Sequence, residues 1–282
     1  MNFLNSVRTP AWVAGLVLPT ITCESCRRST SLRNHSIHKA GIRMREGWYC
    51  SSGCFTSAAQ TKLMELLPTR FENRDHVVRM PLGLSLIRRG VLTQAQFIEM
   101  TGRQRETGDE IGDVLVRSGT LSEKTITEAR AHLWNCPVFA VPKHVSQTEI
   151  RIPSSLLNLY SAIPLHYVAA TKLLLVGFVY GVEYALLYAI EQMTGARTQA
   201  CFVTPSDFDT HIQQIARNRL EDSSSKVVNI NSAQTPSEMA HTLCRFSIDF
   251  EADKVQIVRC QEHVWARLNC DSKNLDILFK VG

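Results

Sequence analysis

Long apolar runs are missing from this sequence of 282 residues. A membrane-spanning helix needs roughly 18 to 20 apolar residues, and the best N-terminal candidate, residues 11–18, is too short. The residues before Cys23 match neither a cleavage site nor a lipoprotein signal. We therefore expect a cytoplasmic protein with no membrane span.

Signatures of nucleotide hydrolysis and of common catalytic sites are missing as well. The pattern G-x-x-x-x-G-K-[ST] occurs nowhere in the sequence, which excludes ATP binding by a P-loop. Residues 137–220 contain no paired carboxylates, no Ser-His-Asp arrangement and no reactive-cysteine context. The sequence therefore predicts a protein that is not an enzyme and does not hydrolyse ATP.

A strong excess of one charge is also missing. The net charge of +5 weakly favours anionic partners but identifies neither nucleic acid nor membrane. With 44% apolar and 20% charged residues, the composition is that of an ordinary globular protein. The length leaves room for two or three small domains, each with its own core.

Nine cysteines are present, and four of them form two close pairs, Cys23-x-x-Cys26 and Cys50-x-x-x-Cys54. An odd number without an export signal argues against a disulfide framework and for metal ligation plus buried thiols. Zn²⁺ prefers four soft ligands in a tetrahedron, which two close pairs supply. We predict a structural Zn²⁺ site on these four cysteines. The alternative is a cluster of free thiols that is buried or redox-active.

The cysteine segment is expected to form a zinc-ribbon or treble-clef module over residues 1–67, with a helix at 56–67. Four cysteine ligands leave no open position for water, so the metal is predicted to have no catalytic role. Loss of zinc should loosen the segment 1–60 and leave the rest folded. Trp48 and Tyr49 lie among basic residues, which leaves open a nucleic-acid surface or a simple cover for the zinc core.

An internal repeat follows, in which one constant spacing separates equivalent positions of two copies. It relates the pairs Gly83 and Gly112, Gly90 and Gly119, Leu92 and Leu121, and Phe97 and Ile126. Each copy predicts a short helix with a glycine cap, then a second helix that begins after Thr93 or Ser122. The second helices are expected at 94–104 and 123–133. Each copy is therefore a helix–turn–helix unit, within residues 81–134.

This doubled pattern resembles the MshE N-terminal type of domain in type II secretion and type IV pilus assembly ATPases. The resemblance covers roughly residues 80–220. In that family each motif opens Arg-Leu-Gly and closes on Gln, and the pair wraps one cyclic di-GMP. The residues that the resemblance places at such a site are Leu82, Gly83, Leu86, Gly90, Leu92, Gln104, Ile111, Gly112, Leu115, Gly119 and Leu121.

Two departures from the family pattern bear on that ligand. Pro81 and Glu110 stand where the opening arginines belong, and Leu133 replaces the second closing glutamine. Losing charge-assisted contacts to phosphate costs about 1.5 to 3 kcal/mol per hydrogen bond, so we expect weak cyclic di-GMP binding or none. Arginine at both positions 81 and 110 is expected to raise the affinity.

The remaining segments predict small α/β units. An edge strand at 137–142 is followed by the order α-β-β-α-β-α, at 152–160, 162–170, 172–179, 182–194, 199–203 and 205–220. Residues 221–234 are expected to be a polar linker. A helix at 236–248 and strands at 254–259, 263–268 and 275–280 complete a C-terminal piece at 235–282. This piece resembles the subdomain that precedes the nucleotide core in the same ATPases.

The whole sequence therefore predicts an α+β protein with three parts: a zinc module, a helical repeat with a small α/β sandwich at 80–220, and a C-terminal α/β piece. The leading hypothesis is a non-enzymatic regulatory or protein-interaction module. The resemblance to the secretion and pilus assembly ATPases implies a protein partner among inner-membrane secretion or pilus assembly components. The alternatives are a cyclic di-GMP receptor and a zinc-dependent nucleic-acid-binding protein.

Overall fold

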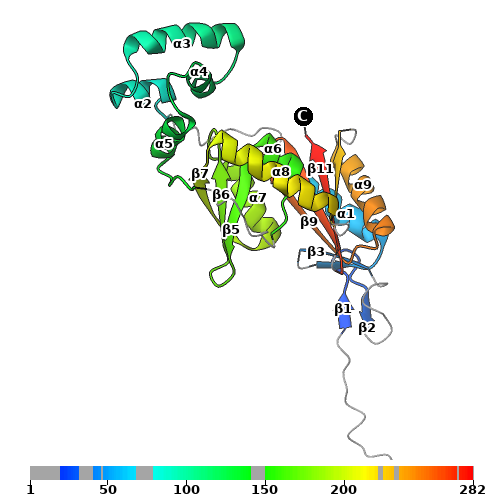
Figure 1. The fold of residues 1–282 in the computed structure, drawn as a ribbon. Coiled ribbons are helices and arrows are strands. Elements are labelled where there is room, and N and C mark those ends of the chain that lie inside the picture. The colour runs from blue at the N-terminus through cyan, green and yellow to red at the C-terminus, as the bar shows by residue number, and fades with distance from the viewer. Residues whose placement is uncertain are drawn as a thin grey trace, which may run out of the picture.

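A computed structural model describes residues 20–31, 41–45, 47–67, 79–140, 150–221, 225–231, 235–271 and 273–281 of the chain. Within them, two larger sheets with helices around them lie beside a group of four helices (Figure 1). The α+β class agrees with the sequence prediction. The N-terminal candidate segment 11–18 lies outside the described residues.

The largest sheet combines strands from both ends of the chain, in the order β4-β3-β9-β10-β11-β8. Its strands are β3 (Ile42–Met44), β4 (Gly47–Tyr49), β8 (Ser225–Ile230), β9 (Lys254–Cys260), β10 (His263–Cys270) and β11 (Lys273–Lys280). Strands β9, β10 and β11 were predicted as strands, and they pair as an antiparallel meander. Strand β8 pairs in parallel with β11. It lies in the segment 221–234, so the prediction of a linker there was wrong.

Two helices, α1 (Ser52–Leu66) and α9 (Pro236–Asp249), cover one face of this sheet. Phe55 and Leu63 of α1 are fully buried in one cluster with Leu243 of α9 and with Val255. Strand β3 also pairs directly with β9. The described parts of the segments 1–67 and 235–282 therefore share one core, and loosening of the segment 1–60 alone stays a prediction.

The smaller sheet has the order β5-β6-β7, with β5 and β6 antiparallel and β6 and β7 parallel. The predicted order of its elements is confirmed by α6 (Ser154–Leu159), β5 (Ala162–Val168), β6 (Leu173–Phe178), α7 (Tyr184–Thr194), β7 (Arg197–Phe202) and α8 (Pro205–Glu221). The expected edge strand at 137–142 is reduced, within the described residues, to one bridge between Val138 and Phe202.

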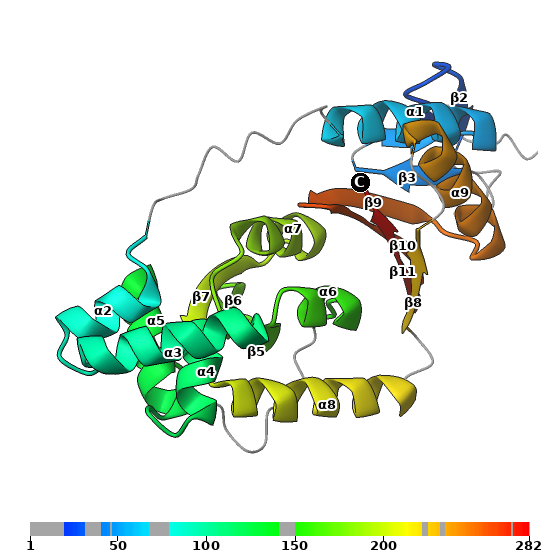
Figure 2. The same ribbon diagram turned by 90° about the horizontal axis from the view of Figure 1, so that it is seen from above.

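Helix α7 lies between the two sheets, and α8 covers the opposite face of the smaller one (Figure 2). Leu186 and Ile190 of α7 are fully buried in the same cluster as Trp265 of β10. On the other face, Ile163 and Val203 pack in a second cluster with α8. The two sheets and their helices therefore form one packed body.

The repeat forms four helices, α2 (Leu82–Arg88), α3 (Gln94–Thr107), α4 (Ile111–Arg117) and α5 (Glu123–Trp134). Thr93 and Ser122 cap α3 and α5 as predicted, because their hydroxyls accept backbone N–H groups of the first turn. Helix α3 runs past its predicted end at 104 to Gly108, whose φ of 74° ends it. The predicted helix–turn–helix pair is confirmed.

A buried ion pair ties the large sheet to the segment before α6. The Arg267 guanidinium donates to both oxygens of Asp276, at 2.7 and 3.0 Å, and also to the carbonyl of Arg151 at 2.6 Å. Trp265 Nε1 donates to the same carboxylate at 2.8 Å. Both charged side chains are almost fully buried, and such a pair is retained only when its remaining polar atoms are satisfied.

Candidate functional site

The four predicted metal ligands come together at one end of the large sheet. Cys23 follows β1 (Thr20–Thr22), and Cys26 lies in the turn before β2 (Ser29–Ser31). Cys50 precedes α1, and Cys54 lies in its first turn. The two cysteine pairs lie on a short hairpin and at the start of a helix, which agrees with the predicted zinc-ribbon or treble-clef module.

The sulfur positions fit a tetrahedral metal. Cys26 Sγ is 3.5 Å from Cys50 Sγ, and Cys50 Sγ is 3.9 Å from Cys54 Sγ. All four sulfur atoms lie within 4.8 Å of one another. Zinc–sulfur bonds of about 2.3 Å in a tetrahedron require sulfur separations of about 3.8 Å. The cluster therefore fits Zn²⁺ with four thiolate ligands and no open position.

Backbone and hydroxyl groups prepare the cysteines as ligands. Burial raises the pKa of Cys23, but hydrogen bonds from the backbone of Cys26, Cys50 and Ser25 outweigh it and bring this pKa to about 6. Hydrogen bonding to the Ser51 side chain lowers the pKa of Cys54. The Cys26 side chain, followed by burial, raises the pKa of Cys50 to about 12. A metal would have to displace the Cys50 proton, because only thiolates bind it.

Trp48 in the second hairpin is joined to the cluster through its backbone. Its side chain is buried, and Cys23 forms a bridge with it while the Glu24 N–H donates to its carbonyl at 3.0 Å. Tyr49 packs against the core beneath α1 and α9. The Trp48 ring is buried and cannot stack on a base, whereas the Tyr49 ring is only partly buried and lines a cleft beside α1. Whether the two aromatics cover the zinc core or form part of a nucleic-acid surface stays a prediction.

The motif glycines of the repeat serve packing between its helices. A Cβ atom on Gly83 would lie 2.1 Å from the Phe97 ring, and one on Gly112 would lie 3.0 Å from Ile126. Phe97 and Ile126 are equivalent positions of the two copies. Gly90 and Gly119 have φ values of 70° and 72°, which confirms them as left-handed helix caps.

The predicted nucleotide-contacting side chains are mostly internal to the repeat. The fully or nearly buried ones are Leu82, Leu86, Leu92 and Leu115, and those packed around them at half burial are Ile111 and Leu121. Gln104 Nε2 donates to the carbonyl of Asp109 at 3.1 Å, which ties the end of α3 to the start of α4. These residues build the core of the repeat, and their contact with a ligand stays a prediction.

Glu110 has a structural function that the sequence did not indicate. Its carboxylate accepts the Gly112 N–H at 2.7 Å and forms an ion pair with Arg130. Arg130 is 3% exposed and donates to the carbonyl of Val179 at 3.3 Å. Replacing Glu110 by arginine would break this group, so we no longer expect that substitution to raise the affinity for an anion.

Two further contacts fasten the second copy to the α/β half. The Tyr180 hydroxyl donates to Asp113 at 3.1 Å, and burial together with that carboxylate raises the pKa of Tyr180. The Ser206 hydroxyl donates to Glu123 at 2.7 Å. Arg130, Asp113 and Glu123 were missed from the sequence because their partners lie far along the chain, and no local spacing relates them.

Three solved structures resemble parts of this chain. The structure of MshE with cdg is 18% identical, has a TM-score of 0.41, and covers 48% of this chain and 99% of its own. The N-terminal domain of XpsE, in two crystal forms, is 17% identical with TM-scores of 0.38 and 0.31. These matches cover 48% and 52% of this chain and 92% and 97% of the XpsE chains.

The matched structures agree with the resemblance predicted from the repeat. Because the TM-scores are below 0.5, these matches say nothing about a ligand or a partner of this chain. No protein-family model matches the chain, and no curated protein does. Among the helices that the structure describes, none has the length and apolar character needed to cross a membrane.

Proposed function

We propose that this chain is a non-enzymatic, cytoplasmic protein-interaction module of the secretion and pilus ATPase N-terminal type. The observation that carries the proposal is an exposed apolar set on the first copy of the repeat. Leu84, Val91 and Ile98 are 48%, 36% and 63% exposed. Exposed apolar side chains mark a protein contact site when they form one patch, and we propose that these three do. The partner that the resemblance implies is an inner-membrane secretion or pilus assembly component.

Comparison with the second copy supports this proposal. The positions equivalent to Leu84, Val91 and Ile98 hold Asp113, Thr120 and Thr127. Asp113 accepts the Tyr180 hydroxyl, and Thr127 is fully buried with its hydroxyl donated to the Glu123 carbonyl. The second copy thus uses these positions for internal contacts, while the first copy leaves apolar side chains in solvent.

Zinc is proposed to be structural in this module. Four cysteine ligands leave no position for a substrate, and the cluster connects both N-terminal hairpins to the start of α1. Bound metal would therefore hold β3, β4 and α1 in place against the large sheet. Metal analysis of protein purified without chelator should find one zinc per chain.

A cyclic di-GMP receptor is the second candidate function. Both copies lack the opening arginine, but Arg88 and Arg89 are exposed at the end of α2 and Arg105 is exposed in the last turn of α3. They are the candidates to take over a phosphate contact, because Arg103 and Arg117 are already paired with Glu99 and Asp109. Calorimetric titration with the dinucleotide separates this function from the first.

The test of the interaction function is a photo-crosslinking residue at position 98 in cells that make the protein. The matched control is position 248 on α9, because Ile248 is 57% exposed and lies far from the repeat in the sequence. We expect a discrete adduct from position 98 that Leu84→Asp removes. No adduct there, or an equal one from position 248, would contradict the proposal.

A further inference from the structure

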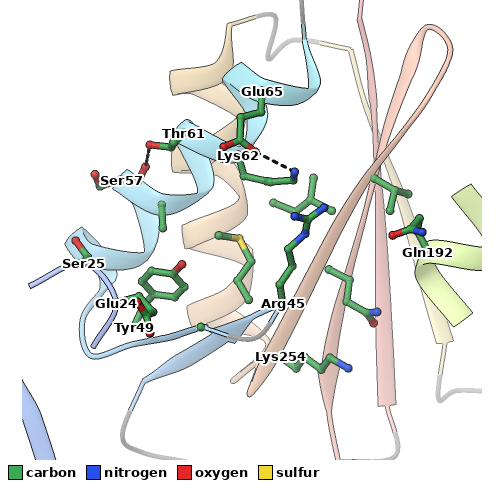
Figure 3. A pocket seen from close by; sticks show the side chains of 16 residues that line it. Glu24, Ser25, Arg45, Tyr49, Ser57, Thr61, Lys62, Glu65, Gln192 and Lys254 are labelled. Carbon is green, nitrogen blue, oxygen red and sulfur yellow. Dashed lines mark hydrogen bonds and ion pairs between the residues drawn. The ribbon is translucent and has the colours of Figure 1, made fainter. Parts of the chain in front are cut away.

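A cleft of about 1160 Å³ lies between α1, the β3–β4 turn, β9 and α7, outside the helical repeat. Its lining residues include Arg45, Lys62, Gln192, Lys254, Gln256 and Ile257. Figure 3 shows Arg45 extending from the turn into the space between α1 and the sheet. Small-molecule sites measure about 300–1,000 Å³, so this cleft has room for several residues of a peptide.

One wall of the cleft is an open strand edge. Strand β3 pairs with β9 only at Lys254 and Val255, and beyond Val255 the described residues supply no strand on that side. The Arg43 N–H donates to the Asp253 carbonyl at 2.9 Å. Alternate residues of a strand direct their backbone groups to the same edge, so the N–H and C=O of Ile257 face the cleft. An added strand there would continue the line of β3.

The charges around this edge are positive. Arg45 and Lys254 are exposed, and no ion pair to either occurs within the described part of the chain. Arg43 lies directly across from Lys254, and like charges in that position repel each other. Both glutamates of the lining are already paired, Glu24 with Arg27 and Glu65 with Lys62. The unbalanced charge therefore suits an acidic occupant.

We propose that this cleft binds an acidic peptide segment of a protein partner, added as an extended strand to the edge of β9. This is a second site, independent of the exposed face of the repeat. Backbone hydrogen bonds to Ile257 would hold the strand, and Arg45 and Lys254 would select carboxylates. Single-stranded nucleic acid is the other anionic occupant, because the partly buried Tyr49 ring also lines the cleft, and the displacement experiment separates the two.

The site depends on the cysteine cluster. Arg45 has a φ of 55° and lies in the turn between β3 and β4. That hairpin is held by the bridge between Cys23 and Trp48 and by the hydrogen bond from Glu24. Removing zinc should therefore also weaken peptide binding.

The test uses two pools of fluorescein-labelled eight-residue peptides and the full chain. Both pools alternate Val, Ile or Thr with charged residues, which are Asp and Glu in one pool and Lys and Arg in the other. We expect fluorescence anisotropy to show binding of the acidic pool alone. N-methylation of alternate backbone nitrogens should abolish it, and hydrogen exchange at Ile257 should slow when the acidic pool binds.

Arg45→Asn removes the charge and keeps a residue that tolerates the left-handed backbone, so the fold is retained. We expect it to weaken binding about fivefold, as for loss of one exposed charge contact. Lys172→Asn is the matched control, because Lys172 is an exposed cation with a φ of 52° in another turn, and it should change nothing.

Four results would overturn the proposal: no binding of the acidic pool, equal binding of the basic pool, unchanged binding after N-methylation, or equal effects of Arg45→Asn and Lys172→Asn. Displacement of the peptide by a single-stranded oligonucleotide at lower concentration would also overturn it, in favour of a nucleic-acid site. A crosslink at position 98 is unaffected by any of these results, so the two proposals can fail separately.

Discussion

The two copies of the repeat share their spacing but differ in their surroundings. The second copy is fastened to the α/β half by Arg130, Asp113 and Glu123. In the first copy, Thr101 stands at the position of Arg130 and Leu84 at the position of Asp113. Neither side chain can form the charged contact that its equivalent forms in the second copy. The shared motif residues fold each helix pair, whereas residues outside the motif decide what each copy contacts.

The largest expected effect is on the stability of the large sheet, which lies outside the repeat. The two copies of the repeat should therefore not differ in their response. Cys50→Ser removes one thiolate ligand, and structural zinc sites contribute about 10–16 kcal/mol of apparent binding free energy. We expect loss of zinc and a fall of at least about 5 kcal/mol in the free energy of unfolding of the large sheet, because α1 packs on α9. Zinc content and tryptophan fluorescence in denaturant measure this.

The matched control for that variant is Cys270→Ser, since Cys270 lies outside the four-cysteine cluster. It should keep its zinc and lose little stability. Protein purified without chelator that holds no stoichiometric zinc would contradict the metal site. Unfolding confined to the segment 1–60 would show that α1 and α9 do not stabilise each other.

The next effect compares the copies directly. Arg130→Ala leaves Glu110 without its partner and the Val179 carbonyl without a donor. Breaking a fully buried pair costs about 3 to 5 kcal/mol, and we expect about 2 to 3 because Glu110 is partly exposed. Thr101→Ala, at the equivalent position of the first copy, should cost about 0.5 kcal/mol. If chemical denaturation gives the same loss of unfolding free energy for both variants, the second copy is not held to the α/β half more firmly than the first.

Alanine at a motif glycine should likewise destabilise the second copy more than the first. A Cβ on Gly112 would lie 2.6 Å from the Arg130 guanidinium, which is buried and held by its hydrogen bonds. A Cβ on Gly83 meets the ring of Phe97, which is only half-buried and can move. We expect Gly112→Ala to cost about 2 kcal/mol and Gly83→Ala about 1 kcal/mol. A larger cost for Gly83→Ala in thermal denaturation would reverse this comparison.

The smallest effects concern the exposed apolar residues of the first copy, Leu84, Val91 and Ile98. Ile98→Ser should change the free energy of unfolding by no more than about 0.5 kcal/mol, because the side chain is in solvent. Thr127→Ser, at the equivalent buried position, removes one methyl group and should cost about 1 kcal/mol. A costly Ile98→Ser would mean that this side chain stabilises the fold and is not reserved for a partner.

Local pattern predicted most of the elements. The hydroxyls before α3 and α5 and the glycine caps at Gly90 and Gly119 all act within a few residues of chain. Cysteine spacing predicted the cluster for the same reason, because each pair is closed by one turn. Such signals can be read from a sequence without knowing the rest of the fold.

The long-range contacts could not be read in this way. Strand β3 is three residues long and pairs with β9 about two hundred residues later, so no periodicity relates them. Strand β8 was hidden in a serine-rich segment, because its pairing depends on β11 rather than on its own composition. Glu110 was misread for a related reason, since its partner Arg130 is known only once the helices are packed.

Calorimetric titration of the purified full chain with cyclic di-GMP tests most directly the claim that the motif residues serve the fold of the repeat. Leu86 and Leu115 are fully buried, Glu110 is engaged with Arg130, and the opening arginines are absent. We therefore predict no binding tighter than about 1 μM, which corresponds to about 8 kcal/mol. Stoichiometric binding well below that concentration would contradict the claim and identify the repeat as a nucleotide receptor.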